Sequence, residues 1–247
     1  METGLSGKIA LVTGSSKGIG LAIAKGLAAE GVRLVMAARG EARLREEATK
    51  LQAVAIPADL SRAEEIESLL RETTVRVGWP DIVIVNAGGP SPGAALAPDD
   101  SAWEAAAQLT LMSAIRLARA CIPAMRERKW GRIVNVTSTS VLVPIPNLVL
   151  SNALRPAVTA FSKTLGAEVA ADGITVNNVA PGATDTERLR ELYPDPGALE
   201  TVIAKIPAGR LASPAEVAAA VVFLCSVPAA MITGQTLVVD GGSTGRA

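Results

Sequence analysis

The stretch that decides the fold lies near the start of the chain and reads Ile9-Ala10-Leu11-Val12-Thr13-Gly14-Ser15-Ser16-Lys17-Gly18-Ile19-Gly20. Its first four residues are apolar, which predicts a short buried strand. The glycine-rich turn that follows runs into a stretch of helical period, Leu21 to Glu30, that ends at Gly31. This order of strand, turn and helix matters more than the glycines, because a glycine triplet alone also occurs in ordinary turns.

In this context the turn predicts a site for the phosphates of a dinucleotide. Gly14 allows a tight turn, Gly18 lets the backbone approach a pyrophosphate, and Gly20 permits close packing of helix against sheet. The dipole of the following helix favours phosphates at its N-terminal end. The same turn supplies three further expected contacts: Ser16, Lys17 and Ile19.

Six more short apolar runs follow the first, separated by segments of helical period. The runs are Arg33 to Ala37, Ala53 to Ile56, Ile82 to Val85, Arg132 to Val136, Thr175 to Val179 and Thr236 to Val239. Alternating strands and helices are typical of a parallel sheet, because each crossover needs a helix to return the chain. No linker or internal repeat divides the chain. We therefore predict an α/β fold, a single doubly wound Rossmann-type domain over 1–247 with seven parallel strands and helices on both faces.

Composition excludes several classes of partner. Lys plus Arg equals Asp plus Glu, at 24 each, and only 2% of residues are aromatic, which argues against nucleic acid or an anionic membrane as a partner. The first residues show no signal-peptide pattern, and no apolar run approaches the roughly 18 residues of a membrane span. We expect a cytoplasmic protein with a small-molecule substrate.

The chemistry available to the chain is also restricted. It contains no histidine, which removes the commonest general acid/base and metal ligand. Its two cysteines, Cys121 and Cys225, lie far apart in apolar stretches, which indicates buried thiols rather than a disulfide or a metal site. We expect no metal.

The glycine spacing G-x3-G-x-G, with Thr13 in front, resembles that of the short-chain dehydrogenase/reductase family. One residue departs from the family pattern, because Val85 stands where the family's Asn-Asn-Ala-Gly motif has its first Asn. Other landmarks of the family follow in order, so that the resemblance covers essentially the whole chain. They are Asp59-Leu60, Asn86-Ala87-Gly88, Pro181-Gly182 with Thr184 and Thr186, Ile232-Thr233-Gly234-Gln235 and Asp240-Gly241-Gly242. The resemblance implies that Asp59 and Leu60 flank an adenine ring. It also implies that the Pro181 segment touches the nicotinamide end and the pyrophosphate.

The choice of coenzyme is expected near the end of the second strand, where an acidic residue would bind an unphosphorylated ribose. Arg39 stands there instead. With Lys17 it could clamp a 2′-phosphate, which favours NADP(H) over NAD(H). The alternative is that Arg39 is merely solvated and Lys17 faces water.

The resemblance fails at the reaction centre. Ser138 matches the family's catalytic Ser, but Ser151 stands where a Tyr is expected and Arg155 where a Lys is expected. The resemblance implies that this Lys also holds the ribose of the coenzyme, and Arg155 could still bind the ribose hydroxyls. Thr110 replaces an Asn of the proton relay. The sequence thus resembles an atypical ketoacyl-carrier-protein-reductase-like branch. Ser151 could take part in chemistry or could simply cap the helix that follows it.

Two functions remain open. The first is an NADP(H)-dependent oxidoreductase acting on a carbonyl or alcohol, such as a 3-oxoacyl thioester, with a water, Ser151 or Tyr193 supplying the proton. The second is a dinucleotide-binding protein with little redox turnover, acting as a sensor or assembly partner. A serine alkanol is far less acidic than a phenol, so we expect coenzyme binding to survive better than proton transfer.

The segment from Thr184 to Ala208 contains Pro194, Pro196 and Gly197 among charged residues. It is predicted to be a mobile flap over the site, the alternative being a surface excursion. Family resemblance further implies a homotetramer, formed through the helices around Trp103 to Arg126 and Asn152 to Ala171 and through the C-terminal strand.

Overall fold

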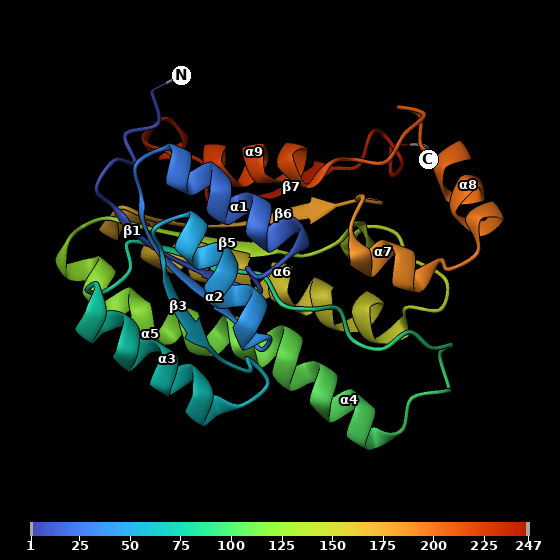
Figure 1. Ribbon diagram of the computed structural model, residues 1–247, viewed down its shortest axis with the longest axis horizontal. Coiled ribbons are helices and arrows are strands. Elements are labelled where there is room, and N and C mark those ends of the chain that lie inside the picture. The colour runs from blue at the N-terminus through green and yellow to red at the C-terminus, as the bar shows by residue number, and fades with distance from the viewer. Residues whose placement is uncertain (1, 246–247) are drawn as a thin grey trace.

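Seven parallel strands form one sheet in the computed structural model, which describes residues 2–245 (Figure 1). The strands are β1 Ile9–Thr13, β2 Arg33–Ala38, β3 Val54–Pro57, β4 Ile82–Val85, β5 Gly131–Val136, β6 Ile174–Pro181 and β7 Thr236–Val239. Their order across the sheet is β3-β2-β1-β4-β5-β6-β7. The predicted fold is confirmed. β6 is longer than expected because it is buried along its whole length and pairs with both β5 and β7.

Helices connect the strands and cover the sheet on both sides. The α-helices are α1 Gly18–Ala29, α2 Glu41–Lys50, α3 Ala63–Arg76, α4 Asp100–Ala107, α5 Ser113–Glu127, α6 Val149–Val169, α7 Glu187–Leu192, α8 Pro196–Ala204 and α9 Pro214–Cys225. One π-helical turn, η1 Gln108–Met112, joins α4 to α5, and the 3-10 turns are η2 Thr139–Val141, η3 Ala170–Asp172 and η4 Val227–Ala229.

Two apolar clusters, one on each face of the sheet, hold these layers together. The first contains Leu11 of β1 and side chains of α3, α5 and α6, and the second contains Ala10 and Val12 with side chains of α1, α2 and α9. Successive side chains of a strand point to opposite faces, so a strand buried on both sides reads as a continuous apolar run. Figure 1 shows α1 and α9 above the sheet and α3 and α5 below it.

The two thiols belong to these clusters. Cys121 of α5 lies in the first and Cys225 of α9 in the second, and both are free and fully buried. Burial raises the pKa of each thiol to about 12. The prediction of buried thiols is confirmed.

The segment α4-η1-α5 forms one continuous helix of 28 residues, Asp100–Glu127. By length and composition alone it could cross a membrane, a criterion that core helices of soluble domains also meet. Its α5 part packs against α3, β4 and β5, and its buried side chains belong to the first apolar cluster. Its place in the fold is therefore that of a core helix.

The topology places the site at one edge of the sheet. The chain runs outward from β1 to β2 and β3, then returns to β4 on the other side of β1, so the strand order reverses between β1 and β4. Ligands of doubly wound folds bind outside the carboxyl ends of the strands at such a point. The loops after β1, β4, β5 and β6 meet there.

The segment predicted as a flap is more ordered than its prolines suggested. It contains α7 and α8, neither of which has a buried residue, and a bridge pairs Thr184 with Ala212 at its base. Asp195 caps α8 by accepting hydrogen bonds from the N–H groups of Gly197 and Ala198. Pro196 stands at the first turn of α8, where its missing N–H costs nothing.

Candidate active site

The turn after β1 folds tightly on itself and leaves no room for side chains at two of its glycines. Gly14 has a φ of +58°, and a Cβ there would lie 2.8 Å from Nδ2 of Asn86 and closer still to its carbonyl oxygen. A Cβ on Gly20 would collide with the Gly14 carbonyl oxygen. It would also lie 2.6 Å from Nδ2 of Asn86, the residue that follows β4, so the start of α1 lies directly against the turn and the end of that strand.

Asn86, at the end of β4, holds this turn in place. Its Nδ2 donates hydrogen bonds to the carbonyl of Gly14 at 3.1 Å and to that of Thr13 at 3.4 Å. Its backbone N–H donates to the Thr13 hydroxyl at 3.0 Å, and that hydroxyl donates to the Ile84 carbonyl at 3.0 Å. The end of β4 is thus bonded to the end of β1 at the switch point, which fixes the shape of the turn.

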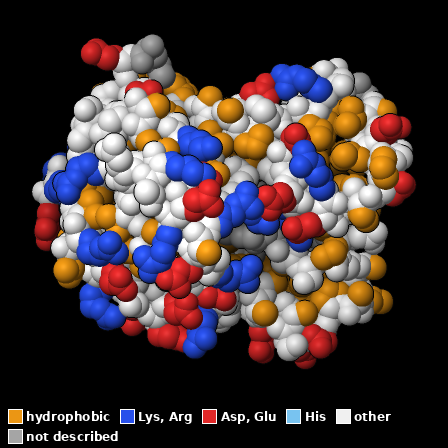
Figure 2. All heavy atoms as spheres, in the orientation of Figure 1, with side chains coloured by type: hydrophobic (Ala, Val, Ile, Leu, Met, Phe, Trp, Pro, Cys, Tyr) orange, Lys and Arg blue, Asp and Glu red, His pale blue; other side chains and the backbone are white. Residues whose placement is uncertain are grey.

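A cleft of about 570 Å³ opens beside this turn. Figure 2 shows this face of the molecule hollowed near its middle, with basic and acidic side chains side by side around the hollow. Apart from Gly20 and Thr110, every expected site residue lines the cleft: Gly14, Ser16, Lys17, Gly18, Ile19, Arg39, Asp59, Leu60, Asn86, Ala87, Gly88, Ser138, Ser151, Arg155, Pro181, Gly182, Thr184 and Thr186. The family landmarks, far apart in the sequence, thus meet in one place.

Three cations stand at one end of the cleft, one more than the sequence analysis expected. The third cation, besides Lys17 and Arg39, is Arg43 of α2. Arg43 was not predicted from the sequence as a site residue, because it lies beyond the strand end that the family pattern covers. The feature of the sequence that could have identified it is a second arginine one helical turn after Arg39. Arg39 is exposed and has no ion-pair partner among residues 2–245.

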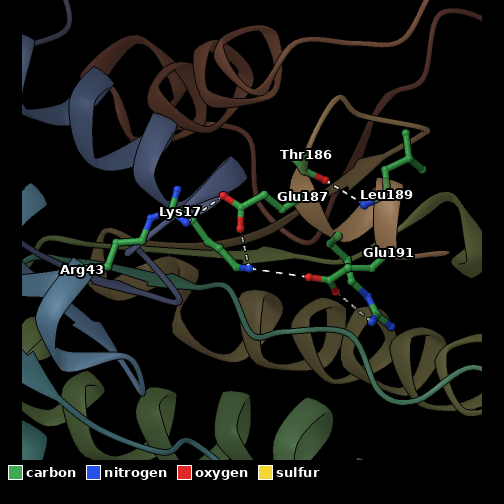
Figure 3. Close-up of polar contacts among 7 residues, drawn as sticks. Lys17, Arg43, Thr186, Glu187, Leu189 and Glu191 are labelled. Atoms are coloured by element: carbon green, nitrogen blue, oxygen red, sulfur yellow. Dashed lines mark hydrogen bonds and ion pairs between the residues drawn. The ribbon is translucent and has the colours of Figure 1, made fainter. Parts of the chain in front are cut away.

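Glu187, the first residue of α7, reaches across the cleft to two of these cations (Figure 3). Its Oε2 is 2.7 Å from Nζ of Lys17, and its Oε1 is 2.7 Å from Nη1 of Arg43. Glu191 of the same helix is 3.7 Å from Nζ of Lys17. Lys17 is therefore about half exposed but does not stand free. It is bound to α7.

The cations also act on the carboxylates near them. Hydrogen bonds from Lys17 and Arg43 lower the pKa of Glu187 below its usual value. Burial alone would raise the pKa of Asp59, but hydrogen bonds from Ser61 and the charge of Arg39 lower it. Both carboxyls are therefore ionised at neutral pH.

At the other end of the cleft, Ser151 and Arg155 form a pair on one face of α6. Nε of Arg155 donates to Oγ of Ser151 at 2.9 Å, across one helical turn. α6 begins two residues before Ser151, and its N-cap is Leu148, which makes no side-chain cap bond. The alternative that Ser151 caps the helix is therefore wrong. Ser138 lines the same cleft and accepts a hydrogen bond from the N–H of Ser140 at 3.2 Å.

Arg155 is held by neutral groups. Its Nη1 donates to the carbonyls of Val136 and Thr137 at 3.1 and 2.8 Å. The side chain as a whole is partly exposed, but its guanidinium lies deep in the cleft wall, and burial together with the charge of Arg188 lowers the pKa of Arg155 to about 10. Arg155 thus stays protonated at neutral pH.

Two residues expected to be near the chemistry lie elsewhere. Thr110, in the π-helical turn, lines a separate cavity of about 10 Å³ behind Arg155, together with Asn135 and Thr137. Its buried hydroxyl has no hydrogen-bond partner within residues 2–245. Tyr193, the single tyrosine of the chain, ends α7 and does not line the cleft formed by the described residues.

The chain was compared with known proteins, beginning with family models. The model described as enoyl-(acyl carrier protein) reductase matches residues 14–244. Among curated proteins, the 3-oxoacyl-(acyl-carrier-protein) reductase FabG of Vibrio cholerae is 37% identical over 242 residues, covering 96% of this chain and 98% of the relative. FabG of Escherichia coli is 38% identical over 238 residues, covering 96% and 97%.

Solved structures of similar shape include further reductases. L-sorbose reductase from Gluconobacter frateurii, complexed with NADPH and L-sorbose, superposes with a TM-score of 0.93 at 36% identity and covers all of both chains. Actinorhodin polyketide ketoreductase with NADPH has a TM-score of 0.92 at 36% identity, covering 96% of this chain and 97% of that chain. The family match, the identities over nearly the full length and the shared glycine-rich turn together show that this chain belongs to the short-chain dehydrogenase/reductase family.

Proposed function

We propose that the protein is an NADP(H)-dependent oxidoreductase that interconverts a carbonyl and an alcohol, with a 3-oxoacyl thioester as the first substrate to test. The oxidoreductase class and the NADP(H) coenzyme expected from the sequence are confirmed by the relatives. The observation that carries the finer proposal is the cleft itself, with a glycine turn and cations at one end and the pair Ser151 and Arg155 at the other.

The residues present fit the coenzyme. A Cβ would fill the turn at Gly14, so the backbone there is shaped for close approach, and α1 begins at Gly18 with its N–H groups open to phosphates. Arg39, Arg43 and Lys17 would hold a 2′-phosphate. When bound, NADP(H) supplies or accepts the hydride.

The side chains of this protein would handle the substrate oxygen and its proton. Ser138 would donate a hydrogen bond that orients and polarises the oxygen. Ser151 accepts a hydrogen bond from Arg155, so its own hydroxyl proton is left to point into the cleft. The guanidinium charge beside it favours loss of that proton, although an alkanol remains a weak acid. We therefore propose a slow enzyme with Ser151 as its proton donor, in place of the family's Tyr.

α7 and α8 form the proposed flap of residues 184–208 over the cleft. Thr186 packs over the glycine turn, with Cγ2 at 3.4 Å from the position of a Cβ on Gly18. Leu189 and Leu192 of α7 line the cleft. Closure of this segment would exclude water from the reacting carbon.

The direct test is NADPH consumption, followed by its absorbance, with a panel of ketones and 3-oxoacyl thioesters. We expect slow oxidation of NADPH, lost in Ser138→Ala and Ser151→Ala. Ser140→Ala is the matched control, because only its backbone N–H contacts Ser138, and Tyr193→Phe should also have no effect. Tight NADPH binding without turnover on any substrate would favour a dinucleotide-binding protein with little redox activity.

A further inference from the structure

Two arginines meet at the reaction end of the cleft without a carboxylate between them. Arg155 comes from α6 and Arg188 from α7, and both line the cleft. A Cβ on Gly89 would lie 3.5 Å from Nε and Nη2 of Arg188 and 3.9 Å from Nη2 of Arg155. The two guanidinium groups therefore face the same small space, which is open because residue 89 has no side chain.

The protein balances the positive charge in this space only weakly, through one long contact between Arg188 and Glu191. Arg155 donates only to a hydroxyl and to two carbonyls. Arg188 donates to the Pro90 carbonyl at 2.9 Å, and its nearest carboxylate oxygen, on Glu191, is 3.7 Å from Nη1. Among residues 2–245, no acidic side chain forms an ion pair with Arg155. Two like charges that lie close together repel each other, and an anion bound between them removes that repulsion.

The opposite end of the cleft differs. There Glu187 already pairs with Lys17 and Arg43. Lys17 and Arg43 are thus partly neutralised in the free protein. Among residues 2–245, Arg155 has no carboxylate partner, and Arg188 has only the 3.7 Å contact with Glu191. Guanidinium groups bind carboxylates with strong, charge-assisted hydrogen bonds.

Resting on the proposed oxidoreductase function but not on the thioester substrate, we propose that Arg155 and Arg188 bind a carboxylate of the substrate. The protein would then act on an oxo acid and its hydroxy acid rather than on a neutral ketone or a 3-oxoacyl thioester. The reaction is otherwise unchanged. A hydride from NADPH adds to the carbonyl carbon, a proton adds to the carbonyl oxygen, and NADP+ is left. The carboxylate would fix the distance between that carbon and the coenzyme.

The diphosphate of the coenzyme offers the same chemistry as a carboxylate, so the test must separate the two. We would compare the parent with Arg188→Gln, which removes the charge but keeps a polar side chain. Arg190→Gln is the matched control, because Arg190 stands on the same helix and pairs with Asp185 at the surface, outside the cleft. NADPH affinity is measured by calorimetry for all three proteins.

Substrate preference is measured with 2-oxo and 3-oxo acids and their methyl esters, for example 3-oxohexanoate and methyl 3-oxohexanoate. We expect the parent to favour the acid by tenfold or more in kcat/KM, and Arg188→Gln to abolish this preference while its NADPH affinity stays within about twofold. Arg190→Gln should match the parent in both measurements. Arg155→Lys, which keeps a cation, should retain part of the preference.

Binding without turnover separates this proposal from the proposed function. The NADP+ complex is titrated with hexanoate and with methyl hexanoate, which cannot be reduced. Hexanoate binding that depends on Arg188 but is not accompanied by turnover of any oxo acid would uphold the anion site and reject the oxidoreductase function. Two results would overturn the anion site. The first is an equal kcat/KM for acid and ester in the parent. The second is an Arg188→Gln protein that loses NADPH affinity but keeps the preference for the acid.

Discussion

Arg39 is the residue at which we expect the choice of coenzyme to be made. It follows β2 directly, is exposed and lines the cleft. A charge-assisted bond to a 2′-phosphate is worth roughly 1.5 to 3 kcal/mol, so NADPH should bind about tenfold or more tightly than NADH. Arg39→Asp should invert this preference, whereas Arg33→Asp, at the other end of the same strand, should not. Equal affinities for both coenzymes in the parent, measured by calorimetry, would contradict the argument.

The proton donor is the second prediction at the scale of residues. A positioned general acid contributes typically ~10² to 10⁴-fold in rate, and a Ser in place of a Tyr should cost a large part of that. Ser151→Tyr with Arg155→Lys should therefore raise the rate of hydride transfer, measured in single-turnover experiments with NADPH. Recovery should be incomplete, because Thr110 still stands where the family has the Asn of its proton relay.

Ser138→Ala provides the control for that double variant and should remove any gain. The prediction fails if the parent already turns over at an ordinary enzyme rate of about 10 per second and loses that activity in Ser151→Ala. Ser151 and Arg155 would then form a competent acid of their own.

At the scale of elements, α7 is tied to the opposite wall of the cleft by Glu187. Its pairs with Lys17 and Arg43 are about half exposed, so water and salt screen them and each holds α7 only weakly. A 2′-phosphate would compete with this carboxylate for the same cations. Glu187→Gln should therefore bind NADPH up to about fivefold more tightly, with NADH affinity unchanged. Lys17 and Arg43 lower the pKa of Glu187 below the ordinary value of a glutamate. These ion pairs therefore break only when the pH falls below that ordinary value.

Hydrogen exchange tests the same contact through the protection of the backbone amides of α7 and α8. α7 and α8 bury no residue, so their amides should be poorly protected in the free protein and gain protection with NADPH. In Glu187→Gln, the α7 amides of the free protein should lose what protection they have. Glu200→Gln, on the outer face of α8, is the control. Strong protection of residues 184–208 without coenzyme would make this segment a fixed part of the structure.

At the scale of the whole molecule, β7 is a free edge of the sheet, and Leu237 within it is 38% exposed. Unpaired strand edges and exposed apolar side chains favour association with another chain. We expect a homotetramer, with a mass about four times 25.3 kDa by light scattering. Leu237→Glu should yield smaller species, whereas Val75→Glu, at an 81% exposed position on α3, should not. A monomeric parent would rule this assembly out.

The sequence by itself determined the sheet, the glycine turn and most of the cleft lining. Each strand is a short apolar run whose signal is local, and parallel connection follows from the helices between the runs. The landmark residues line one cleft because they follow the ends of neighbouring strands in that sheet. Once the order of the strands across the sheet is set, the positions of these strand ends are set as well. Gly14 shows the same logic, since a positive φ in a strand-to-helix turn calls for glycine.

Only the tertiary structure decided how the cleft is charged and which groups touch. Lys17 and Glu187 lie 170 positions apart, and no period or motif announces their contact. Three other features likewise depend on how α6 and α7 are placed over the strand ends. They are the pairing of Ser151 with Arg155, the position of Tyr193 outside the cleft and the approach of Arg188 to Arg155. Such contacts between long side chains are set by the packing of whole elements, because one sequence position constrains a side chain's neighbours only within about a helical turn.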